Sequence, residues 1–322
     1  IHVEAVLSID EMWAWLPLNL RDPATVESIA MKIKATVRRD LGEAVTVSIG
    51  AAPNKFLAKV ASKLRKPDGF FIIQHEDLPE VLHSMTLRDI NGIAKNMEAR
   101  LHAAGIDTVK ELCVAPRAAL HAAWGGVMGE RLWHLLRGVE IPDIVSVRKS
   151  IGHSHVLAPD SRQPDSAWPV LCKLLHKACE RLRSHGMLAG SLTMNLAFYR
   201  GVSWGAEIHA GGTDSTVRLM RLLERLWRDR PEPKAPVLQV GVVLGKLVDI
   251  GNFTPPLFPN LGKEMADVDE AKHRRLDATI DKLRARYGRN VVYFGNVQDA
   301  RQEAPMRISF THIPNVSLEA DD

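Results

Sequence analysis

The chain has 322 residues, of which 46% are hydrophobic and 25% are charged, and its formal net charge is +4. This composition is typical of a globular protein and argues against a disordered or low-complexity chain. No apolar run approaches the length of a bilayer span, so no membrane association is predicted. The three cysteines lack CxxC spacing, which favours buried thiols in a reducing cytoplasm over a disulfide framework or a zinc site.

Residues 1–74 alternate between strand and helix patterns, which predicts an α/β layer. Its predicted elements are a core strand beginning at Val6, a helix at 23–39, a strand at 44–50, a helix at 54–65 and a strand at 69–73. The first strand ends in two adjacent carboxylates, Asp10 and Glu11. Two like charges at the end of a core strand are unfavourable unless a cation binds there.

Positive charge is concentrated between residues 31 and 66, where nine Lys or Arg residues stand against two acids. In the predicted helix and the residue that follows it, four lysines fall on one stripe, at i, i+4, i+8 and i+11: Lys55, Lys59, Lys63 and Lys66. Lysines beside a carboxylate pair suit a metal–triphosphate site, because carboxylates hold Mg²⁺ and ammonium groups neutralise phosphate oxygens. The alternative is an ordinary amphipathic helix whose lysines are solvated.

The chain after residue 74 divides into further segments. Residues 75–140 predict a series of short helices, and residues 141–147 an extended tether. Residues 148–250 predict a small domain with the order β-α-β-β-α-β. Residues 251–322 begin with a proline-rich connection and predict a charged helix at 270–288 and a short strand at 290–296.

Two motifs in the first segment are specific. The residues "SIDE" at 8–11 and "VSIGAAPNKFLAKVASKLRKPDG" at 47–69 closely resemble the palm of the Y-family translesion DNA polymerases. The segment "INGIAKNMEARLHAAGIDTVKEL" at 90–112 resembles the helix–hairpin–helix of that family's thumb. The segment "LDATIDKLRARYGRNVVYFGN" at 276–296 resembles the UmuC-, MucB- and ImpB-like branch.

The resemblance implies a multidomain protein of mixed α/β and α+β class. Its implied parts are a partial palm at 1–74, a helix–hairpin–helix thumb at 75–140, a linker at 141–147, a DNA-binding little finger at 148–250 and a UmuC-like tail at 251–322.

The resemblance also implies an error-prone, template-directed DNA polymerase of translesion synthesis, DNA repair and the SOS response. Its substrates would be primer–template DNA and deoxynucleoside triphosphates, and it would act in the cytoplasm. Asp10 would ligate two Mg²⁺ ions and Glu11 one of them. Lys66 would contact the incoming triphosphate, with Lys59 on the same basic face.

The sequence also departs from the family pattern. Relatives place another metal-binding Asp and the fingers before the SIDE motif, and residues 1–322 hold neither, so the resemblance implies that this sequence alone is inactive. Ala94 replaces the last glycine of a "GIG" hairpin, and Trp15 stands where an Asp is common.

Three sets of residues are candidates for binding macromolecules. The hairpin set is Gly92, Ala94 and Lys95. The little-finger set is Arg148, Lys149, Ser150, Gly152 and Arg200. Leu257 and Phe258 stand where the family has a peptide that binds the sliding clamp, and a UmuD′-like subunit is a further implied partner.

Two other functions stay open. One is a non-catalytic accessory factor of the same fold that binds DNA and recruits other polymerases. The other is a helix–hairpin–helix module for DNA binding or nuclease association, which leaves the palm motif unexplained.

Overall fold

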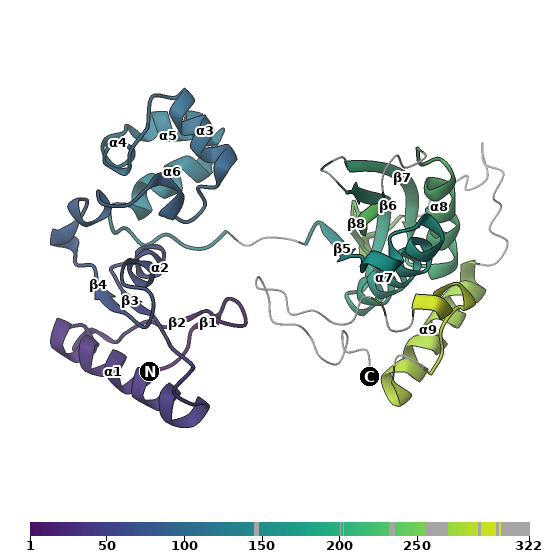
Figure 1. The fold of residues 1–322 in the computed structure, drawn as a ribbon, viewed down its shortest axis with the longest axis horizontal. Coiled ribbons are helices and arrows are strands. Elements are labelled where there is room, and N and C mark those ends of the chain that lie inside the picture. Colours follow the sequence, from purple (N-terminus) through teal and green to yellow (C-terminus); the bar gives the residue numbers. More distant parts are fainter. Residues whose placement is uncertain are drawn as a thin grey trace. The chain divides into compact units, whose positions relative to one another are not determined.

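The computed structural model describes residues 1–144, 148–199, 201, 203–231, 236–254, 270–288, 291–300 and 303. The chain forms two compact units, of which the first contains residues 1–7 and 11–145 and the second residues 8–10 and 146–322 (Figure 1). Each unit has its own hydrophobic core. Among the described residues, no helix is both long enough and apolar enough to cross a bilayer.

The first unit begins with a short hairpin and a long helix. Strand β1 (Ala5–Val6) pairs antiparallel with β2 (Met12–Trp13). Helix α1 (Pro23–Leu41) is capped by Asp22, whose carboxylate accepts the Thr25 N–H at 2.9 Å. It ends at Gly42, whose φ of 100° is a conformation that favours glycine.

A second pair of strands supports the lysine-rich helix. Strand β3 (Ile49–Ala51) lies parallel to β4 (Phe70–Ile72), and α2 (Lys55–Leu64) connects them. Leu57, Val60 and Ala61 form the buried stripe of α2, as its apolar spacing predicts.

Residues 75–135 form a series of short helices and turns. Three 3₁₀ turns come first, at His75–Asp77, Glu80–Leu82 and Leu87–Asp89. Four helices follow: α3 (Lys95–Ala103), α4 (Val109–Val114), α5 (Arg117–Trp124) and α6 (Val127–Leu135). Their buried leucines join Leu57 and Val60 of α2 in one core, so the lysine-rich helix is anchored to the helical part.

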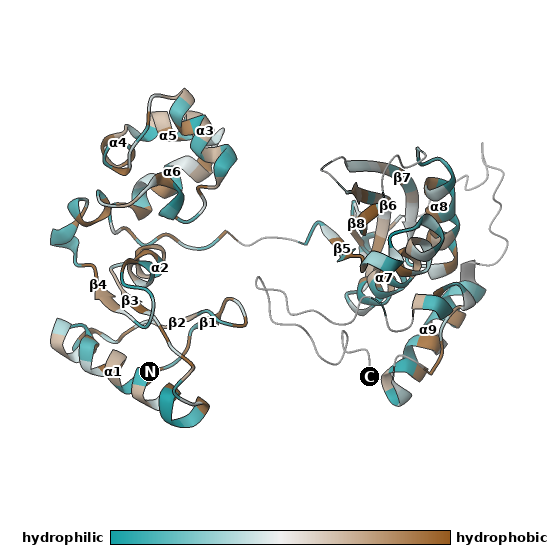
Figure 2. Ribbon diagram, in the orientation of Figure 1, coloured by the Kyte–Doolittle hydropathy of each residue, from teal (hydrophilic) through white to brown (hydrophobic). Residues whose placement is uncertain are grey.

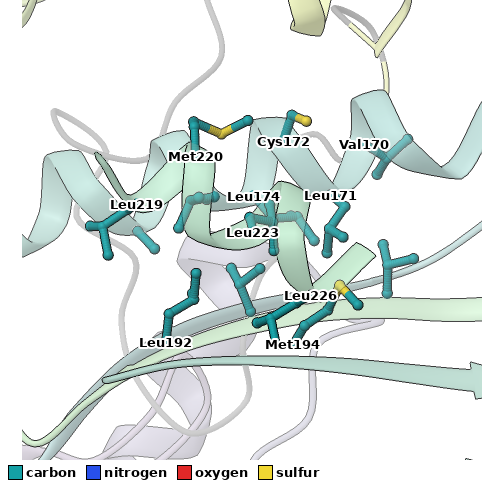
Figure 3. Close-up of a cluster of buried hydrophobic side chains, with 14 of the residues drawn as sticks. Val170, Leu171, Cys172, Leu174, Leu192, Met194, Leu219, Met220, Leu223 and Leu226 are labelled. Atoms are coloured by element: carbon teal, nitrogen blue, oxygen red, sulfur yellow. The ribbon is translucent and has the colours of Figure 1, made fainter. Parts of the chain in front are cut away.

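The second unit contains one antiparallel sheet in the order β5-β8-β6-β7, with β9 (Val248–Asp249) added to β6. The remaining elements are β5 (Ser150–Val156), α7 (Pro164–Ser184), β6 (Met187–Phe198), β7 (Ser203–Thr213), α8 (Thr216–Arg228) and β8 (Val237–Gly245). The predicted β-α-β-β-α-β order is therefore confirmed. Figure 3 shows Leu174 of α7 and Leu223 of α8 packing over Leu192 of β6.

The C-terminal segment adds a third layer to this unit. Helix α9 (Glu270–Tyr287) lies next to α7 and α8, and a 3₁₀ turn at Gly295–Ala300 follows (Figure 1). Val297 and Ala300 of that turn enter the core beside α7. Hydrophilic and hydrophobic residues alternate along α9 (Figure 2).

Three strand predictions need correction. The apolar run that begins at Val6 is not a core strand: β1 has two residues, and Val6 and Leu7 are 50% and 48% exposed. The strand predicted at 44–50 is reduced to β3, because β4, its partner, has only three residues. Residues 291–296 form no strand; the ring of Phe294 instead packs on His176 of α7, 4.8 Å between centroids.

Candidate active site

The carboxylate pair lies in the loop of the β1–β2 hairpin. The Leu7 N–H donates to the Glu11 carbonyl at 2.8 Å and closes the loop. The Ser8 hydroxyl donates to Asp10 Oδ1 at 2.6 Å, which fixes that carboxylate from within the loop. Both carboxylates are accessible to solvent, since Asp10 is exposed and Glu11 is half-exposed.

The lysine-rich helix α2 faces this hairpin. Lys59 Nζ lies 2.6 Å from Glu11 Oε2, with the two side chains 40% and 42% exposed. One turn earlier, Lys55 Nζ lies 5.2 Å from the centre of the Trp13 ring and pairs with Asp143. The structure therefore brings together one predicted metal ligand, Glu11, and one predicted phosphate-binding residue, Lys59.

The next lysines extend the same charged face. Lys63 Nζ donates to Asn91 Oδ1 at 2.6 Å and to the Asp89 carbonyl at 3.1 Å. Burial and then the charge of Lys59 lower the pKa of Lys63, with a smaller contribution from Lys66. This mutual repulsion is the electrostatic setting that an anion would relieve. Lys66 is exposed and lies beyond the end of α2.

Close backbone contact sets the position of α2. A Cβ built on Gly50 of β3 would lie 2.1 Å from the Ala58 carbonyl and 2.3 Å from the Ser62 nitrogen. Only glycine allows this approach, which explains the glycine of the "SIG" motif. At the start of α2, Asn54 accepts the Leu57 N–H at 2.8 Å and donates to the Leu135 and Val139 carbonyls.

The turn after Lys66 is tied to α1. Asp68, at φ 51°, pairs with Lys34 and Arg38 of α1, and its carbonyl also accepts from Lys34. Burial raises the pKa of Asp68, but the Lys34 hydrogen bond and the charges of Arg38 and Lys34 outweigh it and hold the pKa below its usual value.

The donor set of the hairpin fits Mg²⁺. Asp10 and Glu11 supply hard oxygen ligands, and Mg²⁺ in phosphate-transfer sites is usually held by one or two carboxylates plus water and phosphate oxygens. Within the ranges that the structure describes, no three His, Cys, Asp or Glu side chains converge on one point. In the structure the Lys59 ammonium group pairs with the Glu11 carboxylate, so a cation bound by Glu11 would compete with Lys59 for that carboxylate.

The predicted DNA hairpin presents backbone N–H groups. Gly92 has φ 90°, and the exposed Ala94 and Lys95 flank the start of α3, where no side chain caps the helix. Ala94 has an extended backbone with φ −101°, which any residue adopts, so replacing a glycine there causes no strain. Ile93 between them is buried and anchors the turn.

The open face of the second unit's sheet contains small and polar residues. Gly152 and Ser154 of β5 line a shallow hollow of about 440 Å³, together with Asn195, Ser203 and Gln239 of the neighbouring strands. A Cβ on Gly152 would lie 2.9 Å from the Val242 carbonyl. A side chain at this position would therefore press against the backbone of β8.

Positive charge gathers where β5 begins. Arg148, Lys149 and Ser150 are exposed there. Burial, followed by the charges of Arg148 and Arg181, lowers the pKa of His185, which places these groups in one neighbourhood. Three further candidates, Arg200, Leu257 and Phe258, lie outside the described residues.

Comparisons with known proteins give this geometry its context. A model of the impB/mucB/samB family matches residues 2–63, and a model of that family's C-terminal domain matches residues 148–254. DNA polymerase IV of Moorella thermoacetica is 32% identical over 307 residues, covering 89% of this chain and 70% of that protein. DNA polymerase IV of Staphylococcus aureus is 26% identical over 246 residues, covering 75% of this chain and 68% of that protein.

A solved Y-family DNA polymerase chimera of Dbh and Dpo4 has the same fold, with a TM-score of 0.52 and 22% identity. The alignment covers 71% of this chain and 66% of the chimera, slightly less than two thirds of its length. The chain belongs to the Y family of DNA polymerases.

Several residues that shape this Y-family site could not be singled out from the sequence. Ser8 is part of the SIDE motif, but only the structure shows its hydroxyl on Asp10. The partners of Asp68 are 30 and 34 residues away on α1, so no local pattern reveals them. The open-face residues Asn195 and Gln239 become neighbours only through strand pairing.

Proposed function

We propose that this chain supplies the carboxylate edge, the phosphate-binding lysines and the DNA-holding surfaces of a template-directed Y-family DNA polymerase that acts in translesion synthesis. The observation that carries the proposal is the pairing of Glu11 with Lys59. It sets the carboxylate loop directly against the lysine face of α2. Family membership supports it, since relatives of this family are named DNA polymerase IV.

Each part of the site has one role in the proposal. Asp10 and Glu11 would hold two Mg²⁺ ions, which when bound activate a primer 3′-hydroxyl and stabilise charge on the attacking and leaving oxygens. Lys66, and Lys59 once it is released from Glu11, would neutralise phosphates of the incoming deoxynucleoside triphosphate. Asp68 would position Lys66 through its ion pairs to α1.

DNA would be held without reading its sequence. In the proposal, the backbone N–H groups around Gly92, Ala94 and Lys95 bind phosphates of the primer–template. Arg148, Lys149, Ser150 and Gly152 contact the duplex backbone from the edge and open face of the second unit's sheet. Arg200 remains a further candidate for the same role.

Other parts of the proposal concern partners and setting. Leu257 and Phe258 would dock on a sliding clamp, and a UmuD′-like subunit would associate with the polymerase. The protein would act in the cytoplasm during the SOS response. These remain proposals that follow from the family resemblance of the sequence.

The test is primer extension by the protein as its gene encodes it, with Mg²⁺, primer–template and deoxynucleotides. Asp10→Asn removes a ligand charge and should lower the extension rate by at least roughly a hundredfold while leaving DNA affinity unchanged. Asp160→Asn, at an exposed position of the second unit, is the matched control and should extend normally.

Retention of full activity by Asp10→Asn would contradict the assignment of the carboxylates. A wild-type protein that binds primer–template and extends nothing would instead support the accessory-factor alternative, in which the fold recruits other polymerases.

A further inference from the structure

Two acids of helix α9, Asp277 and Asp281, face the interior of the second unit. Asp281 makes a bidentate pair with Arg183 of α7, at 2.6 and 2.8 Å. Asp277 accepts the Thr216 N–H at 3.0 Å, at the start of α8, and lies 3.8 Å from Arg183. Asp277 and Asp281 are the only two acids in residues 272–287, so this part of the helix has its negative charge on the side that faces α7 and α8.

The inward arginines of α9 are matched as well. Arg284 lies 3.6 Å from Glu180 of α7, and Arg274 lies 3.1 Å from Asp214. The inner face of the helix is therefore a set of paired charges against α7 and the start of α8. Any net charge must appear on the outer face.

That outer face carries cations. Arg275, Lys282 and Arg286 are exposed at i, i+7 and i+11, a spacing that puts them on one side of a helix. They span roughly 16 Å along the axis. None of the three forms an ion pair with a residue that the structure describes. We call these three residues the α9 basic face.

We propose that the α9 basic face is a second nucleic-acid-binding surface, which binds phosphates of the DNA backbone. A helix exposed only for solubility commonly carries charges of both signs on its outer face, whereas residues 272–287 of this helix turn Asp277 and Asp281 inward and present cations outward. A regular row of cations is complementary to a polyanion.

The exposed aromatic residue next to the face fits the same partner. Tyr287 is 55% exposed, and the Arg286 guanidinium lies 5.2 Å from its ring centre. Arg and Tyr together form the type of platform on which unpaired bases stack. A membrane is a poorer fit, because Leu276 and Tyr287 are the only large exposed apolar side chains of α9.

This surface is distinct from the site proposed above. The family models match residues 2–63 and 148–254, and α9 lies outside both ranges. The inference rests on the proposed function only in taking DNA as the polyanion, and it does not depend on nucleotidyl transfer.

The experiment measures affinity of the natural protein for primer–template DNA by fluorescence anisotropy at several salt concentrations, with EDTA and without nucleotide. The triple variant Arg275→Gln, Lys282→Gln and Arg286→Gln should bind about tenfold more weakly at 0.1 M salt. Its slope of log K against log salt should be smaller by about 2.7, the loss of three phosphate contacts. Its thermal unfolding should match wild type, because all three side chains are exposed.

Two matched variants make the result specific. Lys32→Gln, Arg225→Gln and Arg228→Gln remove the same charge from exposed positions on α1 and α8, and should change the slope by less than about 1. Arg275→Lys with Arg286→Lys keeps the charge and should retain the wild-type slope.

An unchanged slope in the α9 triple variant overturns the proposal, as does an equal loss in the control variant, which would show an effect of net charge alone. Loss of binding to anionic vesicles or to polyglutamate, with DNA affinity unchanged, assigns the face to another partner and also overturns it. The Asp10→Asn variant tests the proposed catalytic site alone, because it should lose primer extension while its DNA affinity, measured by anisotropy, stays unchanged. The outcome for one proposal therefore does not decide the other.

Discussion

At the residue scale, His176 of α7 is a histidine buried in the second unit. Its ring packs against Phe294, and its Nε2 has no hydrogen-bond partner among the residues that the structure describes. Burial, together with the charges of Arg284 and Arg183, lowers its pKa from 6.5 to about 3. The folded unit therefore holds a neutral imidazole that unfolding would allow to protonate.

The sign of the pH effect follows from that shift. Because the folded pKa lies below the unfolded value, the unfolded state binds more protons below about pH 6.5, and stability decreases as the pH falls toward about 3. From pH 7.5 to pH 5 this group should cost about 2 kcal/mol of unfolding free energy. His176→Leu should remove that dependence in urea titrations of the second unit, whereas His2→Leu, at an exposed position, should not. If both variants showed the same pH dependence of stability, His176 would not be its source.

The two α7 cysteines follow the same physics. Burial raises the pKa of both Cys172 and Cys179 to about 12. Both thiols are buried and free in the structure, which agrees with the prediction from their spacing. Their burial among leucines makes them inert packing residues.

At the element scale, Gly50 decides how closely α2 approaches β3. Gly50→Ala should destabilise the first unit by about 1–3 kcal/mol, because the added methyl group would overlap the backbone of Ala58 and Ser62. Gly295→Ala has nothing within 4 Å of the added atom and should be neutral in the same urea titration. A neutral Gly50→Ala would mean that α2 can move away from the strand without cost.

Also at this scale, Arg183 fixes α9 to α7. Arg183→Met should cost about 3 kcal/mol or more, because it leaves the buried Asp277 and the partly buried Asp281 without their counter-charge. Arg225→Met, an exposed change on α8, should stay within about 0.5 kcal/mol. If urea unfolding gave the same small loss of unfolding free energy for both variants, it would contradict the claim that Arg183 fixes α9 to α7.

Helices were more predictable than strands, for a physical reason. The helix predicted at 23–39 has its cap and its stop within the local sequence, at Asp22 and Gly42, and it is confirmed. A strand exists only where a partner strand is available, and the sequence does not show the partner. Of the strand predicted at 290–296, the described residues 291–296 form no strand, and Phe294 packs on His176 of α7 instead.

The candidate site was partly predictable for the same reason. The spacing of Lys59 along α2 and the position of Glu11 after a strand were visible in the sequence, but their 2.6 Å contact was not. Asp277 and Asp281 belong to a segment that the sequence predicted only as a charged helix. Only the position of Arg183, nearly 100 residues earlier, shows that they face inward.

At the scale of the whole molecule, the two cores should unfold separately. Leu112 belongs to the core of the first unit and Leu192 to that of the second. Leu112→Ala should destabilise the first unit, and Leu192→Ala the second, each by about 2–5 kcal/mol. In calorimetry each variant should therefore lower the midpoint temperature of one transition and leave the other transition unchanged. A single transition that shifts with both variants would show that the units unfold together.

The third layer over α7 has a consequence for protein engineering. Val297 and Ala300 fill space beside α7, so the turn at Gly295–Ala300 belongs to the hydrophobic core of the second unit. A hybrid polymerase that imported residues 148–254 from a relative and kept this chain's own C-terminal segment would combine two surfaces that were not selected to fit each other. Exchange boundaries should therefore be placed after residue 303, so that helix, turn and sheet are transferred together.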